Sequence, residues 1–221
     1  GWQAQDTPLV LNLRGTNVLI AETRQLRAVA NPDVVVRYRA GEPLQVSGSV
    51  TLPEADIHLE RLDEGVSASD DVVVLDPVDP KRTRANPLDL DLTLVMGEQV
   101  AINGFGLVGT LGGRLRVRAL PGREVRGTGA LDVAGRYTAY AQRLQITRGR
   151  LLWSDTPVGD PLLDIRAERQ VGEVTAGIRV EGRASAPRAT VYSNPAKSES
   201  EALAYLTLGR PLSSLTGDEA R

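Results

Sequence analysis

The chain of 221 residues contains no cysteine. Disulfide bonds, thiolate catalysis and cysteine-based zinc sites are therefore excluded. Aromatic residues make up only 4% of the chain, with a single phenylalanine and two tryptophans. A globular β-domain of this length generally fills its centre with aromatic side chains, which bury roughly 150–250 Å² each. The apolar surface must come instead from Val, Leu, Ile and Ala, which suit a broad and shallow layer.

A basic excess is also missing, because 26 Lys and Arg residues stand against 28 Asp and Glu residues. A nucleic-acid-binding protein normally carries such an excess to neutralise phosphates, so we set that class aside. No run of about 18 apolar residues is present, so the sequence predicts no helical membrane span. The first residues lack a start methionine and a signal pattern. We interpret the chain as a segment of a longer protein, with any targeting sequence upstream.

What the chain does have is an alternation of apolar and polar residues. In residues 88–94, leucine occupies every second position, and Asp89, Asp91 and Thr93 stand between the leucines. A strand places these two sets on opposite faces, whereas the 3.6-residue period of a helix would scatter the leucines. The same alternation recurs at residues 9–13, 34–38, 44–52, 57–59, 115–119, 131–133, 144–146, 151–153, 163–167, 174–180 and around Val191.

Gly- and Pro-containing turns separate these runs, and regular spacing of this kind predicts about a dozen strands in an antiparallel meander. We predict an all-β fold: a long, curled antiparallel sheet, open like a gutter or partly closed, with an apolar concave face. The alternative is a two-layer sandwich, in which the apolar face would be consumed as core. The low aromatic content favours the gutter. We assign residues 1–197 to this elongated β-domain, with a loop or linker at 63–87 that holds a short strand at 72–75.

A short helix is predicted near the end of the chain. Ser198 and Glu201 form a capping-box pattern, Leu203 and Leu206 supply a small apolar stripe, and Gly209 marks the end. The helix is assigned to residues 198–210 and a flexible tail to 211–221. Two roles stay open for the helix: closing one end of the sheet and protecting its edge, or docking on a partner.

Three motifs were weighed as possible chemical sites. Residues 104–109 fit the dinucleotide pattern GxGxxG, but a strand pattern follows where a helix is needed, so we interpret them as glycines at a sheet bend. The single histidine, His58, lies in an alternating strand and is expected to be exposed. The acidic pairs Asp70–Asp71 and Asp89/Asp91 could bind a cation, but solvated charges are the better interpretation. No nucleophile elbow is present, so we predict no catalytic residue, no metal and no cofactor.

The candidate site is instead the apolar face itself. A sheet that curls around a lumen too wide for side chains to fill leaves an apolar channel, which fits acyl chains or an amphipathic β-segment. The residues expected to line this groove are Leu88, Leu90, Leu92, Leu94, Leu131, Val133, Leu144, Ile146, Leu163, Ile165, Ala176 and Ile178.

The second half of the chain resembles the C-terminal region of the TamB family. Residues 135–146, GRYTAYAQRLQI, are similar to the family's GxYxAYGQxLxI stretch, and residues 203–210 resemble its LxYLxxGR motif. Similar blocks lie between them in the same order, and the resemblance is dense from about Gly127 to Arg210. Ala141, Trp153 and Asp160 depart conservatively from the family's usual glycine, phenylalanine and asparagine.

The resemblance implies an elongated periplasmic β-structure with an apolar groove, anchored upstream in the inner membrane of a Gram-negative bacterium. It implies contact near the C-terminal end with a TamA-like outer-membrane barrel subunit, for which Leu203, Tyr205 and Leu206 are the candidate residues. It also implies roles in moving phospholipid toward the outer membrane and in assembling outer-membrane proteins, including autotransporters. We therefore carry two hypotheses, a phospholipid-conducting groove and a scaffold that binds client β-strands.

Overall fold

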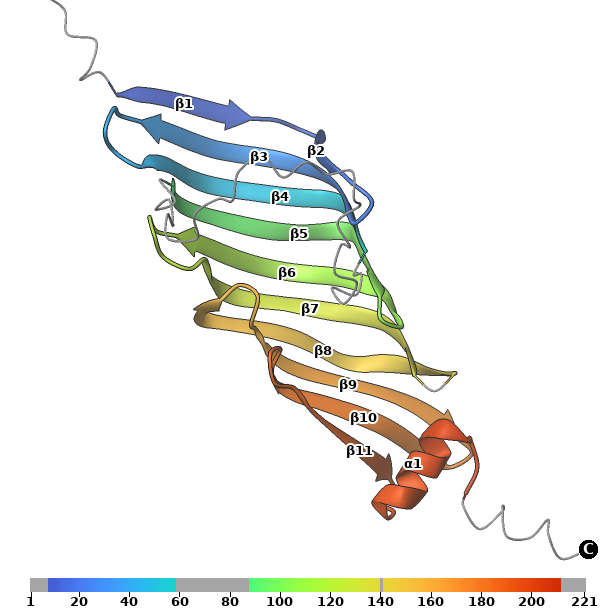
Figure 1. Ribbon diagram of the computed structural model, residues 1–221. Coiled ribbons are helices and arrows are strands. Elements are labelled where there is room, and N and C mark those ends of the chain that lie inside the picture. Colours follow the sequence, from blue (N-terminus) through green and yellow to red (C-terminus); the bar gives the residue numbers. More distant parts are fainter. Residues whose placement is uncertain (1–7, 59–87, 140, 212–221) are drawn as a thin grey trace, which may run out of the picture.

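The computed structural model describes residues 8–58, 88–139 and 141–211. Within these ranges the chain forms one open sheet of eleven strands and one short helix (Figure 1). The predicted all-β class, the open sheet and the C-terminal helix are confirmed. The elements are β1 Leu9–Arg14, β2 Val18–Glu22, β3 Leu26–Tyr38, β4 Leu44–His58, β5 Leu88–Gly104, β6 Leu107–Ala119, β7 Arg126–Ala139, β8 Gln142–Pro157, β9 Leu162–Val171, β10 Val174–Arg183, β11 Arg188–Asn194 and α1 Glu199–Thr207.

From β3 to β11 each strand pairs with the next strand in the sequence, so the sheet grows in one direction along the chain. Figure 1 shows the strands stacked side by side and twisting progressively, with α1 beside the ends of β10 and β11. Because the sheet does not close, it has two free edges among the described strands. One edge is β11, and the other is formed by β1 and β2, which both pair with β3.

The sequence did not predict β2 or the first half of β3. The segment Asn31-Pro32-Asp33 is typical of a turn, yet β3 runs straight through it. On this side of β3, the pairing with β1 ends at Arg14 opposite Asp33, and the pairing with β2 begins at Val18 opposite Ala30. Pro32 lies between these two pairings, where the neighbouring edge is interrupted. Proline is tolerated in a strand where no ladder hydrogen bond is required of its nitrogen, and such a gap in an edge meets that condition.

The prediction of a wholly antiparallel sheet was wrong at one place, because β4 and β5 pair in parallel. Antiparallel neighbours need only a short hairpin, whereas parallel neighbours need a connection long enough to return to the starting end of the sheet. The segment 59–87 makes that connection and lies outside the described residues, as does the predicted strand at 72–75. The loop or linker predicted at 63–87 falls within this segment, whose length allows the parallel pairing of its two neighbours.

The sheet has two chemically different faces. All the buried hydrophobic side chains in the described strands lie on the face that carries Leu88, Leu90, Leu92 and Leu94, which we call the groove face. We call the opposite face, which carries Asp89, Asp91 and Thr93, the outer face. The apolar side chains of neighbouring strands therefore cover one another on the groove face, whereas the polar side chains of the outer face extend into solvent.

The dinucleotide-like motif forms the hairpin between β5 and β6. Gly104 pairs with Leu107, and the two residues between them, Phe105 and Gly106, have φ angles of 50° and 87°. Two consecutive positive φ angles in a two-residue loop are the geometry of a type I′ hairpin turn, which matches the twist of the flanking strands. The interpretation of this motif as glycines at a sheet bend is confirmed.

Adjacent glycines in β6 provide a test of how tightly the sheet is built. Gly113 has a φ of +109°, and a Cβ added there would lie 2.5 Å from the carbonyl oxygen of Ala130 on β7, whereas a Cβ on Gly112 would meet nothing within 4 Å. We predict that Gly113→Ala lowers the free energy of unfolding by about 1–3 kcal/mol, because alanine is strained at that φ. Gly112→Ala should leave it unchanged or raise it by up to about 1 kcal/mol. Urea denaturation of the two variants compares them directly, and equal midpoints would contradict this packing.

Candidate functional site: the groove face

Strand pairing brings the predicted groove residues onto one face. Leu94 of β5 lies opposite Leu115 of β6. Leu115 in turn lies opposite Gly129 of β7, which lies opposite Trp153 of β8. Because directly paired residues point to the same side of a sheet, this row crosses the groove face from β5 to β8.

A second row extends the face to β9. Met96 lies opposite Gly113, which lies opposite Leu131. Leu131 then lies opposite Leu151, which lies opposite Leu163. A third row crosses from β8 to β11 and consists of Ile146, Ala167, Ile178 and Val191. Alternation along each strand and the pairing of its neighbours place all the predicted wall residues on the groove face: Leu88, Leu90, Leu92, Leu94, Leu131, Val133, Leu144, Ile146, Leu163, Ile165, Ala176 and Ile178.

Burial along the groove face is uneven. Leu88, Leu90, Leu92 and Leu94 are all half-buried. Burial is complete at other positions of the same face, in both halves of the chain: Ala55 is 1%, Val100 0%, Leu144 1% and Ala176 0% exposed. Among the described residues, the leucines of β5 therefore keep apolar surface that no other side chain fully covers, which is the condition that an apolar binding face has to meet.

Sequence reasoning missed several groove-face residues that form a separate apolar cluster. Leu115, Leu131 and Trp153 are buried together, and Met96, Val117 and Leu151 pack against them. Only Leu131 was predicted. The signal that could have found most of the others is the register. Leu115 and Val117 lie opposite Leu94 and Leu92, Leu151 lies opposite Leu131, and Trp153 lies diagonal to Leu131.

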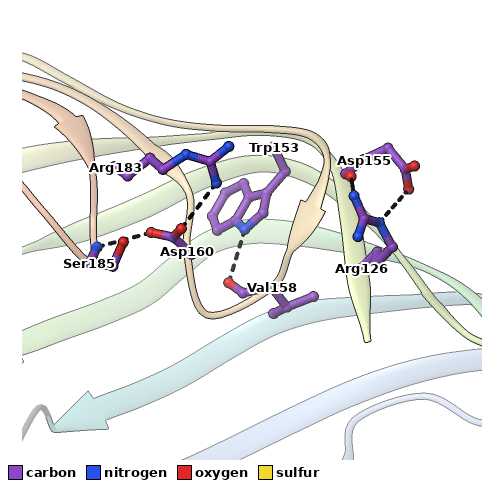
Figure 2. A network of polar contacts seen from close by, with 7 residues as sticks. All are labelled: Arg126, Trp153, Asp155, Val158, Asp160, Arg183 and Ser185. Carbon is purple, nitrogen blue, oxygen red and sulfur yellow. Dashed lines mark hydrogen bonds and ion pairs between the residues drawn. The ribbon is translucent and has the colours of Figure 1, made fainter. Parts of the chain in front are cut away.

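Trp153 makes two close contacts through the five-membered ring of its indole. Its Nε1–H donates to the carbonyl oxygen of Val158 at 2.9 Å (Figure 2). At the neighbouring ring atom, a Cβ on Gly127 would lie 2.9 Å from Cδ1, so the glycine leaves room for the ring beside β7. A buried tryptophan generally needs a partner for its N–H, and the turn after β8 supplies one.

Figure 2 shows that the neighbouring turn is also fixed by polar contacts. The Asp160 carboxylate accepts from the backbone N–H of Ser185 at 2.9 Å and pairs with the Arg183 guanidinium at 3.1 Å. These contacts, the backbone donor first, hold the pKa of Asp160 below its usual range. Arg126 and Asp155 form an ion pair at 3.3 Å beside it. Polar contacts therefore link the turn after β8 to the neighbouring strands at this end of the groove face.

The outer face carries ion pairs that cross from strand to strand. Arg116 on β6 donates to both carboxylate oxygens of Asp91 on β5, at 2.7 and 2.5 Å. This hydrogen bonding is the main cause of a lowered pKa at Asp91. Arg148 with Asp164 repeats the arrangement between β8 and β9 at 2.6 Å. A slip of one residue in the register of a strand would move its charged side chains to the groove face. The ion pairs and the apolar face therefore favour the same register between neighbouring strands.

The helix α1 covers the C-terminal end of the groove face. It packs mainly on β10 and β11, and Leu206, which is 1% exposed, joins the apolar cluster that contains Leu144, Ala167 and Ala176. Ser198 is the N-cap, and its hydroxyl accepts from the N–H of Glu201 at 3.3 Å, as the capping-box pattern predicts.

The candidate partner-binding residues do not share one environment. Leu203 is 40% exposed, whereas Leu206 is buried against the sheet. Tyr205 packs against the same cluster as Leu206, and its ring lies 5.5 Å from the ammonium of Lys197. While α1 is docked, Leu203 is exposed, Tyr205 is half-buried and Leu206 is inaccessible to a partner.

The remaining candidates are placed as follows. His58 ends β4 and is exposed. Asp91 is engaged by Arg116, while Asp70–Asp71 lie outside the described residues. The ranges described here contain no cluster of three or more metal-ligating side chains. Within the same ranges no helix is long and apolar enough to cross a bilayer.

An open sheet of eleven strands with one apolar face and one charged face defines the class of the protein: an extended, one-sided β-sheet. The family model for the TamB C-terminal domain matches residues 1–221. The chain is also 31% identical over 94% of its length to the translocation and assembly module subunit TamB of Haemophilus influenzae. The chain belongs to the TamB family. It spans 17% of the length of that relative.

The tyrosine on β11 gives a pH-dependent test of the C-terminal end. Burial, and then a hydrogen bond from its hydroxyl to Glu168, raise the pKa of Tyr192 to about 12. The protonated form is favoured in the folded state, so its stabilising contribution is complete below the usual tyrosine value of about 10 and is lost as the pH rises toward 12.

We predict that ultraviolet titration of the folded protein contains a component near pH 12 that Tyr192→Phe removes. If the two titration curves are identical, the Tyr192–Glu168 contact is wrong.

Proposed function

We propose that this chain is the groove segment of a TamB-type envelope protein that holds phospholipid acyl chains on their way toward the outer membrane. The observation that carries the proposal is the half-exposed row of leucines on β5, Leu88 to Leu94, on a face continuous with the buried apolar residues of β6 to β10. Acyl chains gain free energy on such a surface because apolar area leaves water, while headgroups stay at the open side.

The proposal places the chain in the periplasm, as part of a protein anchored in the inner membrane of a Gram-negative bacterium. Its proposed partner is a TamA-like outer-membrane subunit, contacted near α1. The part played is transport and assembly without catalysis. Family membership supports this assignment, since the matched relative is named as a subunit of a translocation and assembly module.

A second candidate is a scaffold for client β-strands of outer-membrane proteins. The observation that favours it is the edge formed by β1, where Leu9, Val10 and Leu11 are 63%, 50% and 49% exposed. An edge strand offers unpaired backbone groups, and its exposed apolar side chains on both faces could bind an added strand. The lipid groove remains the primary proposal because its apolar surface extends across the sheet.

The primary proposal predicts that Leu92→Arg blocks lipid passage without unfolding the sheet. A half-buried position in an open groove lets the guanidinium reach water, so folding persists. An arginine facing hydrocarbon costs roughly 2.5–3.5 kcal/mol, so lipid occupancy should fall at least about tenfold. Ser47→Arg is the matched control, since it adds the same charge on the outer face opposite Asp91.

The measurement is lipid recovered on photocrosslinkers at Leu90 and Leu94, flanking the substituted position, with circular dichroism as the folding check. If Leu92→Arg unfolds the protein while Ser47→Arg does not, position 92 belongs to a packed core and the groove is wrong. If the crosslinkers recover only peptide, the scaffold hypothesis replaces the lipid one.

A further inference from the structure

We propose that α1 is a displaceable closure of the C-terminal end of the groove, which must leave the groove face before an acyl chain can reach β10 and β11. This inference rests on the proposed lipid-binding function and adds a step to it. The closed state is the one that the structure shows.

The position of α1 is the first observation. Leu206 is 1% exposed and packs within the same apolar cluster as Ala167 and Ala176, which are 2% and 0% exposed. These two alanines belong to the groove face, which is half-exposed at the leucines of β5. The helix therefore occupies apolar surface that would otherwise continue the groove to its last strands.

The way in which α1 is fastened is the second observation. Two groove-face side chains donate hydrogen bonds to its carboxyl end: Gln142 Nε2 to the carbonyl of Thr207 at 3.1 Å, and Arg169 Nη1 to the carbonyl of Leu206 at 3.2 Å. The last carbonyls of a helix have no partner within it, and a cation at this end also complements the helix dipole. The wall of the groove thus supplies the groups that hold the closure.

The small size of α1 is the third observation. The helix has nine residues, and isolated helices of this length are marginal in water because nucleation is unfavourable. Its stability must therefore come from docking, so undocking and unfolding of α1 are coupled. A unit of this kind opens at a lower free energy than the sheet beneath it.

Displacement also changes which residues a partner can contact. Leu206 is buried against the groove face while α1 is docked and becomes accessible when the helix leaves, and the half-buried ring of Tyr205 becomes more exposed. Leu206 cannot pack on the groove face and bind an external partner at the same time. Release of α1 therefore opens the end of the groove and exposes Leu206 in one step.

The first test measures undocking without lipid, by hydrogen exchange of the α1 amides in the full-length protein. Arg169→Met removes the charged donor while keeping a side chain of similar length. We expect exchange in residues 199–207 to rise about tenfold, which corresponds to about 1.4 kcal/mol. Arg166→Met is the matched control, because it makes the same change on β9 but on the outer face. Unchanged exchange in Arg169→Met would overturn the fastening of α1.

The second test locates lipid along the groove in cells that express the full-length protein. A small diazirine amino acid is introduced either at Leu92, on the open wall, or at Ile178, on β10 beside the closure. We expect lipid adducts at Leu92 in every variant, with adducts at Ile178 rising at least threefold in Arg169→Met and in Leu206→Ser. Arg166→Met should match the unmodified protein.

Each failure has a distinct meaning. Adducts at Ile178 that are as abundant as those at Leu92 in the unmodified protein, and unaffected by either releasing variant, would overturn the closure while the lipid groove stands. Loss of adducts at both positions in all variants would overturn the lipid function and the closure with it. Protease resistance of the sheet distinguishes release of α1 from unfolding in each variant.

Discussion

The structure depends on one constraint: a β-strand points successive side chains to opposite faces, and only one face of this sheet is apolar. Every other feature follows from keeping that alternation in register over eleven strands. Leucines that share a side on β5 find apolar partners on β6, while Asp91 meets Arg116 on the other side. A shift by one residue would bury carboxylates and expose leucines, so the apolar face and the outer ion pairs reinforce each other.

This constraint explains why a chain with so few aromatics can build a long structure. A packed two-layer core must be filled by large side chains. A single layer needs mainly small and branched side chains, which pack against their neighbours on the same face. Trp153 is a large side chain on this face, and Gly127 on β7 leaves the room that its ring occupies. Where the sheet would end with apolar surface open to water, α1 covers it, held by Arg169 and Gln142 from the groove wall.

The sequence was sufficient for the fold class, for the C-terminal helix and for the side of the sheet on which Leu88–Leu94 and the other wall residues lie. Period-two patterning carries that information locally. It could not show the parallel pairing of β4 with β5, because strand direction depends on a long connection and not on the strands themselves.

The sequence also could not predict that β3 continues through Pro32. That proline is tolerated because the neighbouring edge is interrupted between β1 and β2. The packing of Leu206 against the groove face was equally inaccessible. It depends on where the helix returns in space, which no local pattern encodes.

The central claim is that the leucine-bearing face stays unfilled by the protein's own side chains and takes up acyl chains instead. Native mass spectrometry of the full-length protein, released gently from envelopes of its host, tests this most directly. The account predicts protein peaks with added masses of whole phospholipids, which disappear when the protein is unfolded in the gas phase. Protein that is consistently free of lipid under conditions that keep the sheet folded would contradict it.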